Sequence, residues 1–435
     1  MFVLRLFTLG PTFRNGYLRQ HIVGAVNVTV SGHTFRFAHS INKSINHKSG
    51  HFSNAFRNSD FEGVQEVPNV GEEHGDGTEV RRLKGNVCEV KDEEHEGEGV
   101  HIPVMVNEVL MALAPQPGEV RHACQVMLDF TFGCGGHSRA LLQQEPTMRL
   151  VAMDRDPEAY KRACLLARKY PGRVFPILGR FSDAWELLQK HGLSNGITGV
   201  LVDAGPSTDQ LTDPARGFGL SCDGPLDMRM DGKKAAVSAA DVVNCLQPEA
   251  LSALLSAYGE DWRANRIARA IYAARPIVST IHLACVVENA YPAGTISRDR
   301  LNRKAHVATR AFQAIRAFVN NEPSELLAAL EVSGRLLQPG GRLAVIAFHS
   351  IEDRIVKRFL QGVPQDSPIG LGARAHIRGR RGLQDLEESK EAKNLTVQEA
   401  VKWQIMSKKV VKASFEEVER NPCARSAKLR AAIRV

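Results

Sequence analysis

The residues best suited to chemistry lie in a glycine-rich turn around residue 133. This turn, Asp129-Phe-Thr-Phe-Gly-Cys-Gly-Gly-His137, follows the apolar run Val126 to Leu128, and a second apolar run ends in Asp154. Glycines let backbone N–H groups approach a ligand at a helix N-terminus, and an acid about 20 residues later can hold ribose hydroxyls. The spacing therefore predicts a pocket for an adenosyl cofactor. A structural tight turn is the alternative for the glycines alone.

The charge of this pocket distinguishes between cofactors. A dinucleotide pocket has a third glycine where this chain has Ser138. Three acids each follow an apolar stretch, and we expect them to face one crevice: Asp129, Asp154 and Asp203. Carboxylates repel a pyrophosphate but attract the cationic sulfonium of S-adenosylmethionine, whose own carboxylate suits a helix N-terminus. The pattern favours S-adenosylmethionine.

Composition limits the class of protein. The chain has 435 residues, of which 43% are hydrophobic and 24% charged, so it has room for two domains. No apolar run reaches the roughly 18 residues that a membrane helix needs, and we expect no membrane span. The eight cysteines lack a C-x-x-C pair or metal-ligand spacing, and we expect no metal.

The charge of the N-terminal part differs from that of the rest. Residues 1–59 contain seven basic residues and no acid, which is typical of a mitochondrial transit peptide; a disordered basic leader is the alternative. Residues 60–98 carry thirteen acids and four bases, and we expect a solvated acidic linker. With +7 in residues 1–59 and −9 in residues 60–98, the total of +8 leaves a net charge of +10 on residues 99–435. This basic part favours a polyanionic partner.

From residue 99 the chain alternates strand-like and helix-like stretches, which predicts an α/β fold with a parallel sheet covered by helices. The expected strands are short and apolar: Val126–Asp129, Arg149–Asp154, Val174–Leu178, Gly199–Asp203 and Arg342–Phe348. The expected helices between them are Ser138–Gln144, Pro157–Tyr170 and Ser182–His191, the last with Ser182 as its N-cap.

The alternation stops between residues 224 and 320, where the sequence predicts an all-helical insertion. Its expected helices are Ser238–Leu246, Pro248–Ala257, Trp262–Ala274, Thr280–Ala290 and His306–Val319. In the last, Phe312, Ile315 and Val319 recur at helical spacing and are expected to pack in a core. Four arginines form either an RNA-facing stripe or a solvated helix face: Arg263, Arg266, Arg269 and Arg275.

Eight segments in order resemble one known family. They are His101-Ile-Pro-Val104, Thr131-Phe-Gly-Cys-Gly-Gly-His-Ser138, Asp154-Arg-Asp156, Arg216-Gly-Phe218, Asp223-Gly-Pro-Leu-Asp-Met-Arg-Met-Asp231, Ala308-Thr-Arg-Ala-Phe-Gln313, Phe348-His-Ser-Ile-Glu-Asp-Arg354 and Asn421-Pro-Cys-Ala-Arg-Ser-Ala-Lys-Leu-Arg430. Together they resemble the small-subunit ribosomal RNA cytosine-4-amino methyltransferases, with their methyltransferase-like relatives in mitochondria. The resemblance implies a class I, Rossmann-like, S-adenosylmethionine-dependent methyltransferase sheet (residues 99–223 and 321–435) interrupted by the helical domain (residues 224–320).

The resemblance also implies a set of site residues. Gly135, Gly136 and His137 would line the methionine end of the cofactor, Asp154 would take the ribose, and Phe181 would lie near the adenine; Asp203 and Gln210 would complete the pocket. The family usually has an Asp-Leu-Gly turn followed by paired serines, whereas this chain has Asp203-Ala-Gly-Pro-Ser-Thr-Asp-Gln210. Proline stiffens this turn, so we expect any change to affect substrate geometry more than cofactor binding.

Methylating a cytosine amine requires alignment of two atoms and an acceptor for an amine hydrogen, but no strong base. Asp203 is the candidate acceptor, and holding the cofactor is its other candidate role. Phe218 or Phe348 could stack the base. His349 either touches the substrate or is structural. Asp227, Arg229 and Asp231 either order a loop or pair with one another.

The sequence thus predicts methylation of a cytidine in mitochondrial small-subunit ribosomal RNA, supporting ribosome assembly in the matrix. The target must be a loop, a splayed strand or a flipped base, because a duplex hides the amine. Two alternatives remain: a methyltransferase acting on another nucleic acid or on protein, and a cofactor-binding ribosome assembly factor with dispensable catalysis. The sequence leaves the oligomeric state open, a homodimer included.

Overall fold

The computed structural model describes residues 21–30, 33–42, 102–114, 125–232, 237–292, 294–295, 297–298, 304–363, 365 and 402–435. The predicted acidic linker, residues 60–98, lies outside these ranges. So do the first and last parts of the predicted leader, residues 1–20 and 43–59. Within the described ranges, no helix combines the length and apolarity needed to cross a bilayer.

The leader contains one pair of strands that we did not expect. Strands β1 (His21–Val30) and β2 (His33–Asn42) pair antiparallel in a two-stranded sheet of their own. Their sequences are rich in valine, threonine and phenylalanine, residue types that favour extended structure. A basic leader without acids therefore need not lack strand-forming sequence.

An eight-stranded sheet forms the centre of the fold. Its order is β10-β12-β9-β6-β3-β4-β5, and β11 pairs with β12. The bounds are β3 (Val126–Asp129), β4 (Arg149–Asp154), β5 (Val174–Leu178), β6 (Ile197–Asp203), β9 (Leu337–Ala347), β10 (Trp403–Ile405), β11 (Val411–Lys412) and β12 (Lys428–Arg434). Strands β3, β4, β5, β6 and β9 are parallel, whereas β12 runs antiparallel to β9. The order reverses at β3, and such a switch point opens a crevice at the carboxyl ends of the strands.

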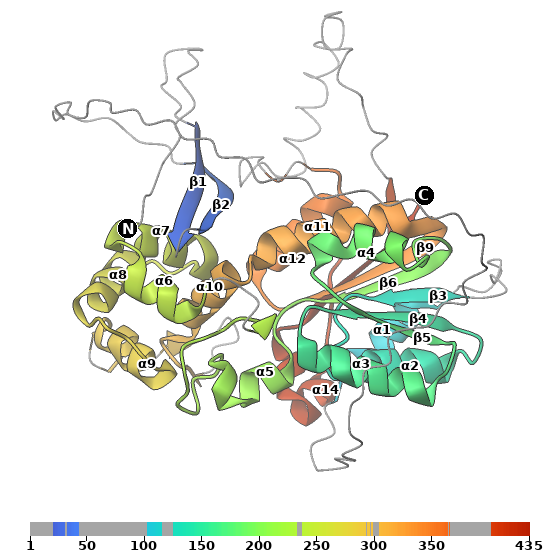
Figure 1. Ribbon diagram of the computed structural model, residues 1–435, viewed down its shortest axis with the longest axis horizontal. Helices are drawn as coiled ribbons and strands as arrows, with labels where there is room; N and C mark the ends of the chain where they lie inside the picture. Colours follow the sequence, from blue (N-terminus) through green and yellow to red (C-terminus); the bar gives the residue numbers. More distant parts are fainter. Residues whose placement is uncertain are drawn as a thin grey trace, which may run out of the picture.

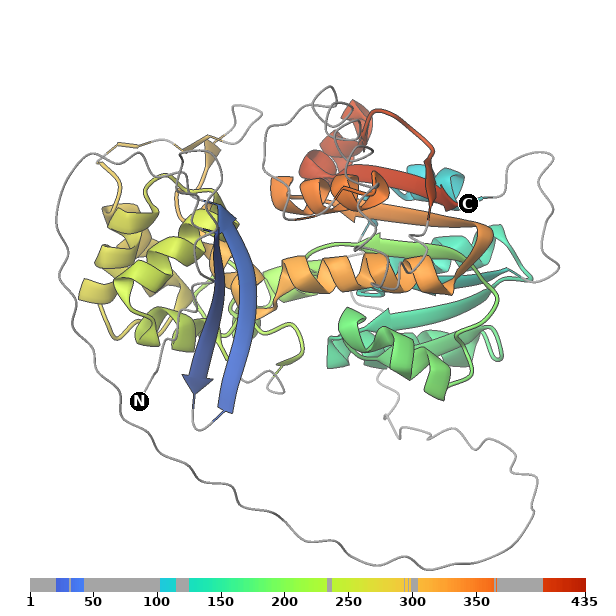
Figure 2. The ribbon, with the colours of Figure 1, turned by 90° about the horizontal axis from the view of Figure 1, so that it is seen from above.

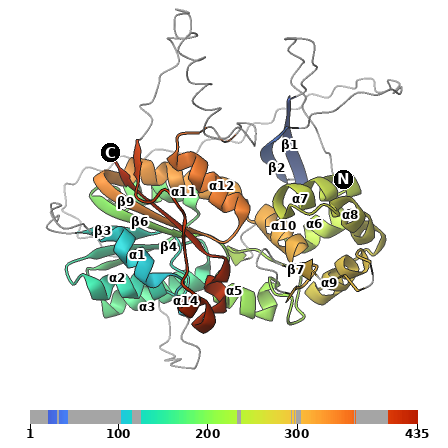
Figure 3. The ribbon, with the colours of Figure 1, turned by 180° about the vertical axis from the view of Figure 1, so that it is seen from behind.

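Helices cover both faces of the sheet, as Figure 3 shows from behind. One face packs against α1 (Val106–Leu113), α2 (Gly136–Gln144) and α3 (Pro157–Lys169). The other packs against α4 (Ala184–Lys190), α11 (Glu322–Leu336) and α12 (Ser350–Leu360). The central strands are apolar on both sides because both faces are buried, as is usual for parallel sheets.

A helical lobe interrupts the sheet between β6 and β9 (Figures 1 and 2). It contains α6 (Ala239–Cys245), α7 (Pro248–Gly259), α8 (Ala264–Ala273), α9 (Thr280–Asn289) and α10 (Thr309–Val319), with the short pair β7 (Ser297–Arg298) and β8 (Lys304–Ala305). These helices share an apolar core of their own, to which Phe312 and Ile315 belong and against which Val319 packs. The predicted apolar stripe of α10 is therefore core.

Two predictions about elements were wrong or incomplete. Ser182 does not cap a helix: it lies in the 3-10 turn η1 (Phe181–Asp183), and its hydroxyl donates to Glu325 Oε1 at 3.0 Å. The antiparallel strands β10 to β12 were not predicted, and the basic residues of the tail lie partly in them. Arg430 of β12, for example, pairs with Asp353 at 2.7 Å.

Candidate active site

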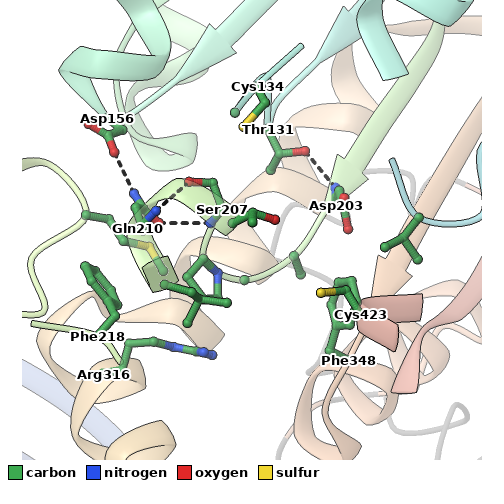
Figure 4. A pocket seen from close by; sticks show the side chains of 18 of the residues that line it. Thr131, Cys134, Asp156, Asp203, Ser207, Gln210, Phe218, Arg316, Phe348 and Cys423 are labelled. Atoms are coloured by element: carbon green, nitrogen blue, oxygen red, sulfur yellow. Dashed lines mark hydrogen bonds between the residues drawn. The ribbon is translucent and has the colours of Figure 1, made fainter. Parts of the chain in front are cut away.

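A cavity of about 570 Å³ opens at the carboxyl ends of the parallel strands, between the sheet and the helical lobe (Figure 4). Its lining comes from the glycine-rich turn, the turns after β4, β6 and β9, helix α10, and the 3-10 turn η4 (Pro422–Ser426). The cavity therefore lies where the reversal in strand order predicts a binding crevice.

The glycine-rich turn is held against the end of β4. The backbone N–H of Gly133 donates to Asp154 Oδ2 at 2.8 Å, and the N–H of Asp156 donates to Asp154 Oδ1 at 2.9 Å. A side chain at Gly136, the first residue of α2, would meet the ring of Pro103 at 3.0 Å. Gly133, Gly136 and Asp154 line the cavity, whereas Gly135 does not, and its N–H donates to the Phe132 carbonyl at 2.7 Å.

His137 and Asp203 face one another across the cavity floor. The ring nitrogen His137 Nε2 lies 2.8 Å from the Val104 carbonyl oxygen, which can only accept, so Nε2 carries a hydrogen. The other nitrogen, Nδ1, lies 3.8 Å from Asp203 Oδ2. The histidine is 7% exposed. The Val104 carbonyl thus orients a ring that borders the Asp203 carboxylate.

Two carboxylates that line the cavity, Asp203 and Asp154, have raised pKa values. Burial raises the pKa of Asp203 to about 6, with His137 opposing the rise and Asp129 and Glu352 adding to it. Burial likewise raises the pKa of Asp154 to about 6, against the two backbone N–H groups it accepts. Asp203 Oδ1 is buried and has no hydrogen-bond partner. Such an atom is costly unless a bound group satisfies it.

Asp129, predicted to face the same crevice, does not line the cavity. It is 1% exposed and accepts from the Ser138 hydroxyl at 2.7 Å and from the Thr131 N–H at 3.0 Å. Its carboxylate is therefore used in hydrogen bonds within the glycine-rich turn and to the start of α2. Of the three acids predicted to face the crevice, Asp154 and Asp203 therefore line the cavity and Asp129 does not.

Gln210 lines the cavity, but its side chain also builds the wall. Its Oε1 accepts from the Ser207 N–H at 3.0 Å, and Ser207 caps α5 (Thr208–Thr212) in return. Its Nε2 donates to Asp156 Oδ2 at 2.7 Å, and Arg216 donates to the same oxygen at 2.8 Å. Asp156 and Arg216 lie in two of the family-like segments, but their function as supports of Gln210 was not predicted.

Aromatic side chains line the cavity on the side of the sheet and on the side of the helical lobe. Phe181, at the sheet side, packs edge-on against Phe130 with ring centroids 5.4 Å apart. Phe348 follows β9 and approaches the turn at Gly205, and Phe218 lines the side of the helical lobe (Figure 4). Phe218 is 5% exposed and Phe348 is half-buried, so Phe348 offers the larger free face.

Titratable side chains line the wall opposite the glycine-rich turn, and of these only His349 was predicted as a candidate site residue. Arg316 of α10 is 8% exposed and makes two bonds to Glu322, of 2.7 and 2.9 Å. Burial and the nearby Arg316 lower the pKa of His349 to about 4, so its ring is neutral at neutral pH. Glu352 accepts from the N–H groups of Phe348 and His349 at 2.8 and 3.0 Å. Arg316 of α10 meets His349 and Glu352 only because α10 packs against the turn after β9, so sequence spacing gives no signal.

The loop that leads into the helical lobe is ordered by two separate ion pairs. Asp227 and Arg229 pair with one another at 2.7 Å, which agrees with one of the predicted alternatives. Asp231 instead pairs with Arg180 and Arg155, at 2.5 and 3.3 Å. Although burial acts in the opposite direction, these arginines lower the pKa of Asp231.

The residues present suit S-adenosylmethionine. A sulfonium and an ammonium are cations, and the carboxylates of Asp154 and Asp203 line the cavity. The glycine-rich turn leaves backbone exposed beside α2, and Phe181 offers a ring to an adenine. In the part of the chain described, no three His, Cys, Asp or Glu side chains cluster as a metal site would require.

Comparison with known proteins agrees with this site. Residues 98–435 match the model of the MraW methylase family. The chain is 48% identical over 344 residues to the 12S rRNA N(4)-cytidine methyltransferase METTL15 of Bos taurus, covering 77% of this chain and 83% of that protein, and 46% identical to the protein of that name from Homo sapiens over the same shares. It is 39% identical to the Ribosomal RNA small subunit methyltransferase H of Granulibacter bethesdensis, over 78% of this chain and 92% of that protein. The chain therefore belongs to the MraW methylase family, which confirms the predicted methyltransferase fold, methyltransferase activity and S-adenosylmethionine as cofactor.

Proposed function

We propose that this protein methylates the exocyclic 4-amino group of a cytidine in mitochondrial small-subunit ribosomal RNA. The observation that carries the proposal is the single cavity in which Asp154 and Asp203 face a wall from the helical lobe. The METTL15 names specify N(4)-cytidine in 12S rRNA and the Granulibacter name specifies small-subunit ribosomal RNA, and both support the substrate.

Seven residues are proposed to hold the cofactor: Gly135, Gly136, His137, Asp154, Phe181, Asp203 and Gln210. Gly135 would act through the shape of the turn, because it does not border the cavity itself. Gln210 would act largely through the wall that it braces with Asp156 and Ser207. When bound, S-adenosylmethionine supplies an electrophilic methyl group on a cationic sulfur.

Asp203 is the proposed acceptor for a hydrogen of the cytidine amine. Its Oδ1 is buried, so Oδ2, which borders His137, is the oxygen available to the amine. A weak base suffices because the amine nitrogen becomes acidic as it is alkylated. Phe348 is the proposed stacking partner of the target base, since it is the less buried of the two candidate rings.

Residues 224–320 are proposed to bind RNA, and the remaining domain, residues 99–223 and 321–435, to carry the chemistry. A base inside a duplex cannot enter a cavity of about 570 Å³ between two lobes. The target is therefore a loop, a splayed strand or a flipped nucleotide. Contacts to phosphates would position the strand, and the cavity would select the base.

Residues 1–59 are proposed to target the protein to the mitochondrial matrix, where the assembling small ribosomal subunit would be its substrate. The acid-free composition supports this proposal. Sequencing the N-terminus of the protein recovered from cells tests it. A cytosolic protein that retains Met1 would contradict the mitochondrial location.

A cofactor-binding assembly factor without catalysis is the second candidate, because Pro206 lies in the cavity wall directly after Gly205. The test uses the protein with its RNA: nucleosides from small-subunit ribosomal RNA are analysed by mass spectrometry after incubation with labelled S-adenosylmethionine. We expect labelled N4-methylcytidine. Cofactor binding without any labelled nucleoside would favour the assembly factor, whereas label in another base or in protein would favour a different substrate.

A further inference from the structure

An exposed tryptophan marks the turn between α7 and α8. Trp262 is 78% exposed, the highest value among the large hydrophobic residues that the structure describes. A large ring in water has no structural reason to be held in place. Here it is held, because the guanidinium of Arg263 lies 4.2 Å from the centroid of the Trp262 ring. An ordered and solvent-facing aromatic surface indicates a partner.

The neighbours of Trp262 fix this arrangement. The buried Asp261 accepts from the Arg263 N–H at 2.8 Å and from the Tyr291 hydroxyl at 2.5 Å. The Arg263 guanidinium also lies 5.1 Å from the ring of Tyr291, so it is stacked between two rings. The arginine therefore serves to orient the Trp262 ring by stacking on it.

Helix α8 continues the pattern along one face. Arg266 and Arg269 are exposed one and two turns after Trp262, and Tyr272, 46% exposed, follows at the next turn. Arg275 lies 4.7 Å over the Tyr272 ring and donates to the Val243 carbonyl at 2.7 Å. Of the four arginines predicted as a stripe, two thus face solvent and two support exposed rings. We call Trp262, Arg266, Arg269 and Tyr272 the α8 stripe.

The α8 stripe begins beside the cavity. Glu260, two residues before Trp262, accepts from the Ser350 hydroxyl and from Arg354 of α12, at 2.7 and 2.8 Å. His349, directly before Ser350, lines the cavity. A side chain at Gly259 would lie 2.9 Å from the carbonyl of Arg310, so the turn also packs closely on α10. Both elements that form the helical wall of the cavity therefore hold the base of the stripe.

We propose that the α8 stripe binds single-stranded RNA adjoining the target cytidine, with one base stacked on Trp262 and phosphates held by Arg266 and Arg269. Alternating rings and cations are the features that bind single strands, because every base has a face to stack and every phosphate a charge. Neither a duplex, whose bases are already stacked, nor an acidic protein would use the rings in this way. The inference rests on the proposed function and specifies where its RNA lies.

Tryptophan fluorescence provides a direct test. The chain has three tryptophans, and the other two, Trp185 and Trp403, are half-buried. The full-length protein is titrated with a 20-nucleotide single-stranded RNA and, separately, with a blunt duplex of that sequence. We expect the single strand to quench the emission and the duplex to quench it much less. In W262F the quench should be lost while binding, followed by anisotropy of a labelled strand, is largely kept, since phenylalanine also stacks.

Two further variants separate stacking from charge. W262A should weaken RNA binding about tenfold, within the range of one base stacked on a ring. R266Q/R269Q should lower the slope of log affinity against log salt by about 1.4, as expected for two phosphates of a single strand. Two control variants carry matched changes on the sheet side, M111A for an exposed apolar residue and K169Q/K190Q for two exposed lysines, and should change neither quantity.

The possible results distinguish this inference from the proposed function. If the wild type methylates its RNA but W262A and R266Q/R269Q bind RNA as it does, the stripe has been misassigned and the function stands. If the variants instead convert a dimer into a monomer in ultracentrifugation with RNA affinity unchanged, the stripe is a contact between copies. If the wild type binds the strand through the stripe but yields no methylated cytidine, the proposed function fails and the surface stands.

Discussion

Asp203 has two oxygen atoms in different surroundings, and this difference defines the chemistry of the cavity. Oδ2 borders an imidazole whose hydrogen position is fixed by the Val104 carbonyl, and Oδ1 is buried without a partner. Folding stability alone disfavours a buried oxygen without a hydrogen-bond partner. The folded protein therefore retains a buried acceptor that has no hydrogen-bond partner among the described residues.

Replacing this carboxylate should increase stability and reduce binding. Because the folded state raises the pKa of Asp203 to about 6, its stabilising contribution is present below the unfolded pKa and is lost as the pH rises through about 6. At pH 7.5, D203N should therefore be more stable than the wild type by on the order of 1–3 kcal/mol. Denaturant unfolding measures this gain, and calorimetry should show much weaker binding of S-adenosylmethionine.

The exposed Glu158 supplies the control, since E158Q should change unfolding by less than about 0.5 kcal/mol. A D203N protein that is less stable than the wild type would show that the carboxylate is satisfied by groups of the protein itself.

Cofactor affinity should depend on pH in the acidic range. Asp154 and Asp203 both have a pKa of about 6, and only their ionised forms attract a cationic ligand. Affinity for S-adenosylmethionine should accordingly be constant above about pH 7 and fall steadily from pH 6.5 to pH 5. Calorimetry across this range, with circular dichroism to verify folding at each pH, measures the effect. A flat profile down to pH 5 would mean that the two carboxylates do not contact the cofactor's charge.

At the scale of elements, the sequence predicted what is local and missed what is not. Strands β3, β4 and β6 were predictable because each is an apolar run that ends in an acid, and buried parallel strands require such runs. Strand β12 is half-exposed and carries charges between apolar residues, so it resembles a basic tail, and β10 has only three residues. The place of β12 in the sheet depends on pairing with β9, and that of β10 on pairing with β12, which no local pattern encodes.

The site was predictable to the same degree. His137 and Asp154 lie within 30 residues of the glycine-rich turn, and motif spacing located them. The prediction that Asp129 faces the crevice was wrong, because an acid at a strand end can point into the fold as easily as into a crevice. Arg316 reaches the cavity through the packing of the helical lobe against the sheet domain, and although Glu352 lies in the family-like segment Phe348–Arg354, its place in the cavity wall was not predicted.

The turn at Gly217 should be the most sensitive element of the loop between the lobes. Gly217 has a φ of +71°, and a side chain there would lie 2.0 Å from the Pro225 carbonyl oxygen. Gly172 has a φ of +74° but open space around it. We expect G172A to cost about 1 kcal/mol, the effect of backbone conformation alone, and G217A several times as much. Urea unfolding of both variants gives the comparison, and equal losses would show that the loop moves aside freely.

At the scale of the whole molecule, one arginine holds both connections between the lobes. Arg155, in the turn after β4, donates to the Asn320 carbonyl at 2.8 Å and to Asp231 at 3.3 Å. Asp231 lies where the chain enters the helical lobe, and Asn320 lies where it leaves. The orientation of the lobes, and with it the width of the cavity, therefore depends on a buried ionic contact.

Breaking that contact should destabilise the protein strongly. D231N would leave Arg155, only 10% exposed, without its anionic partner, and removal of one member of a buried pair costs about 3–5 kcal/mol. K161A, which breaks the exposed pair with Glu158, should cost less than about 1 kcal/mol. Guanidinium unfolding at pH 7.5 tests both variants. If D231N unfolds at the wild-type midpoint, the lobes are held by their apolar packing instead.

The cavity draws its walls from segments spread between Pro103 and Ser426. Translation delivers these segments in order: the glycine-rich turn and its acids emerge early, and the turn at residues 422–426 emerges last. A nascent chain that lacks residues 422–426 therefore has an incomplete cavity, even where its earlier segments have folded. Because ligand binding needs the complete cavity, it should be a sensitive reporter of completed folding.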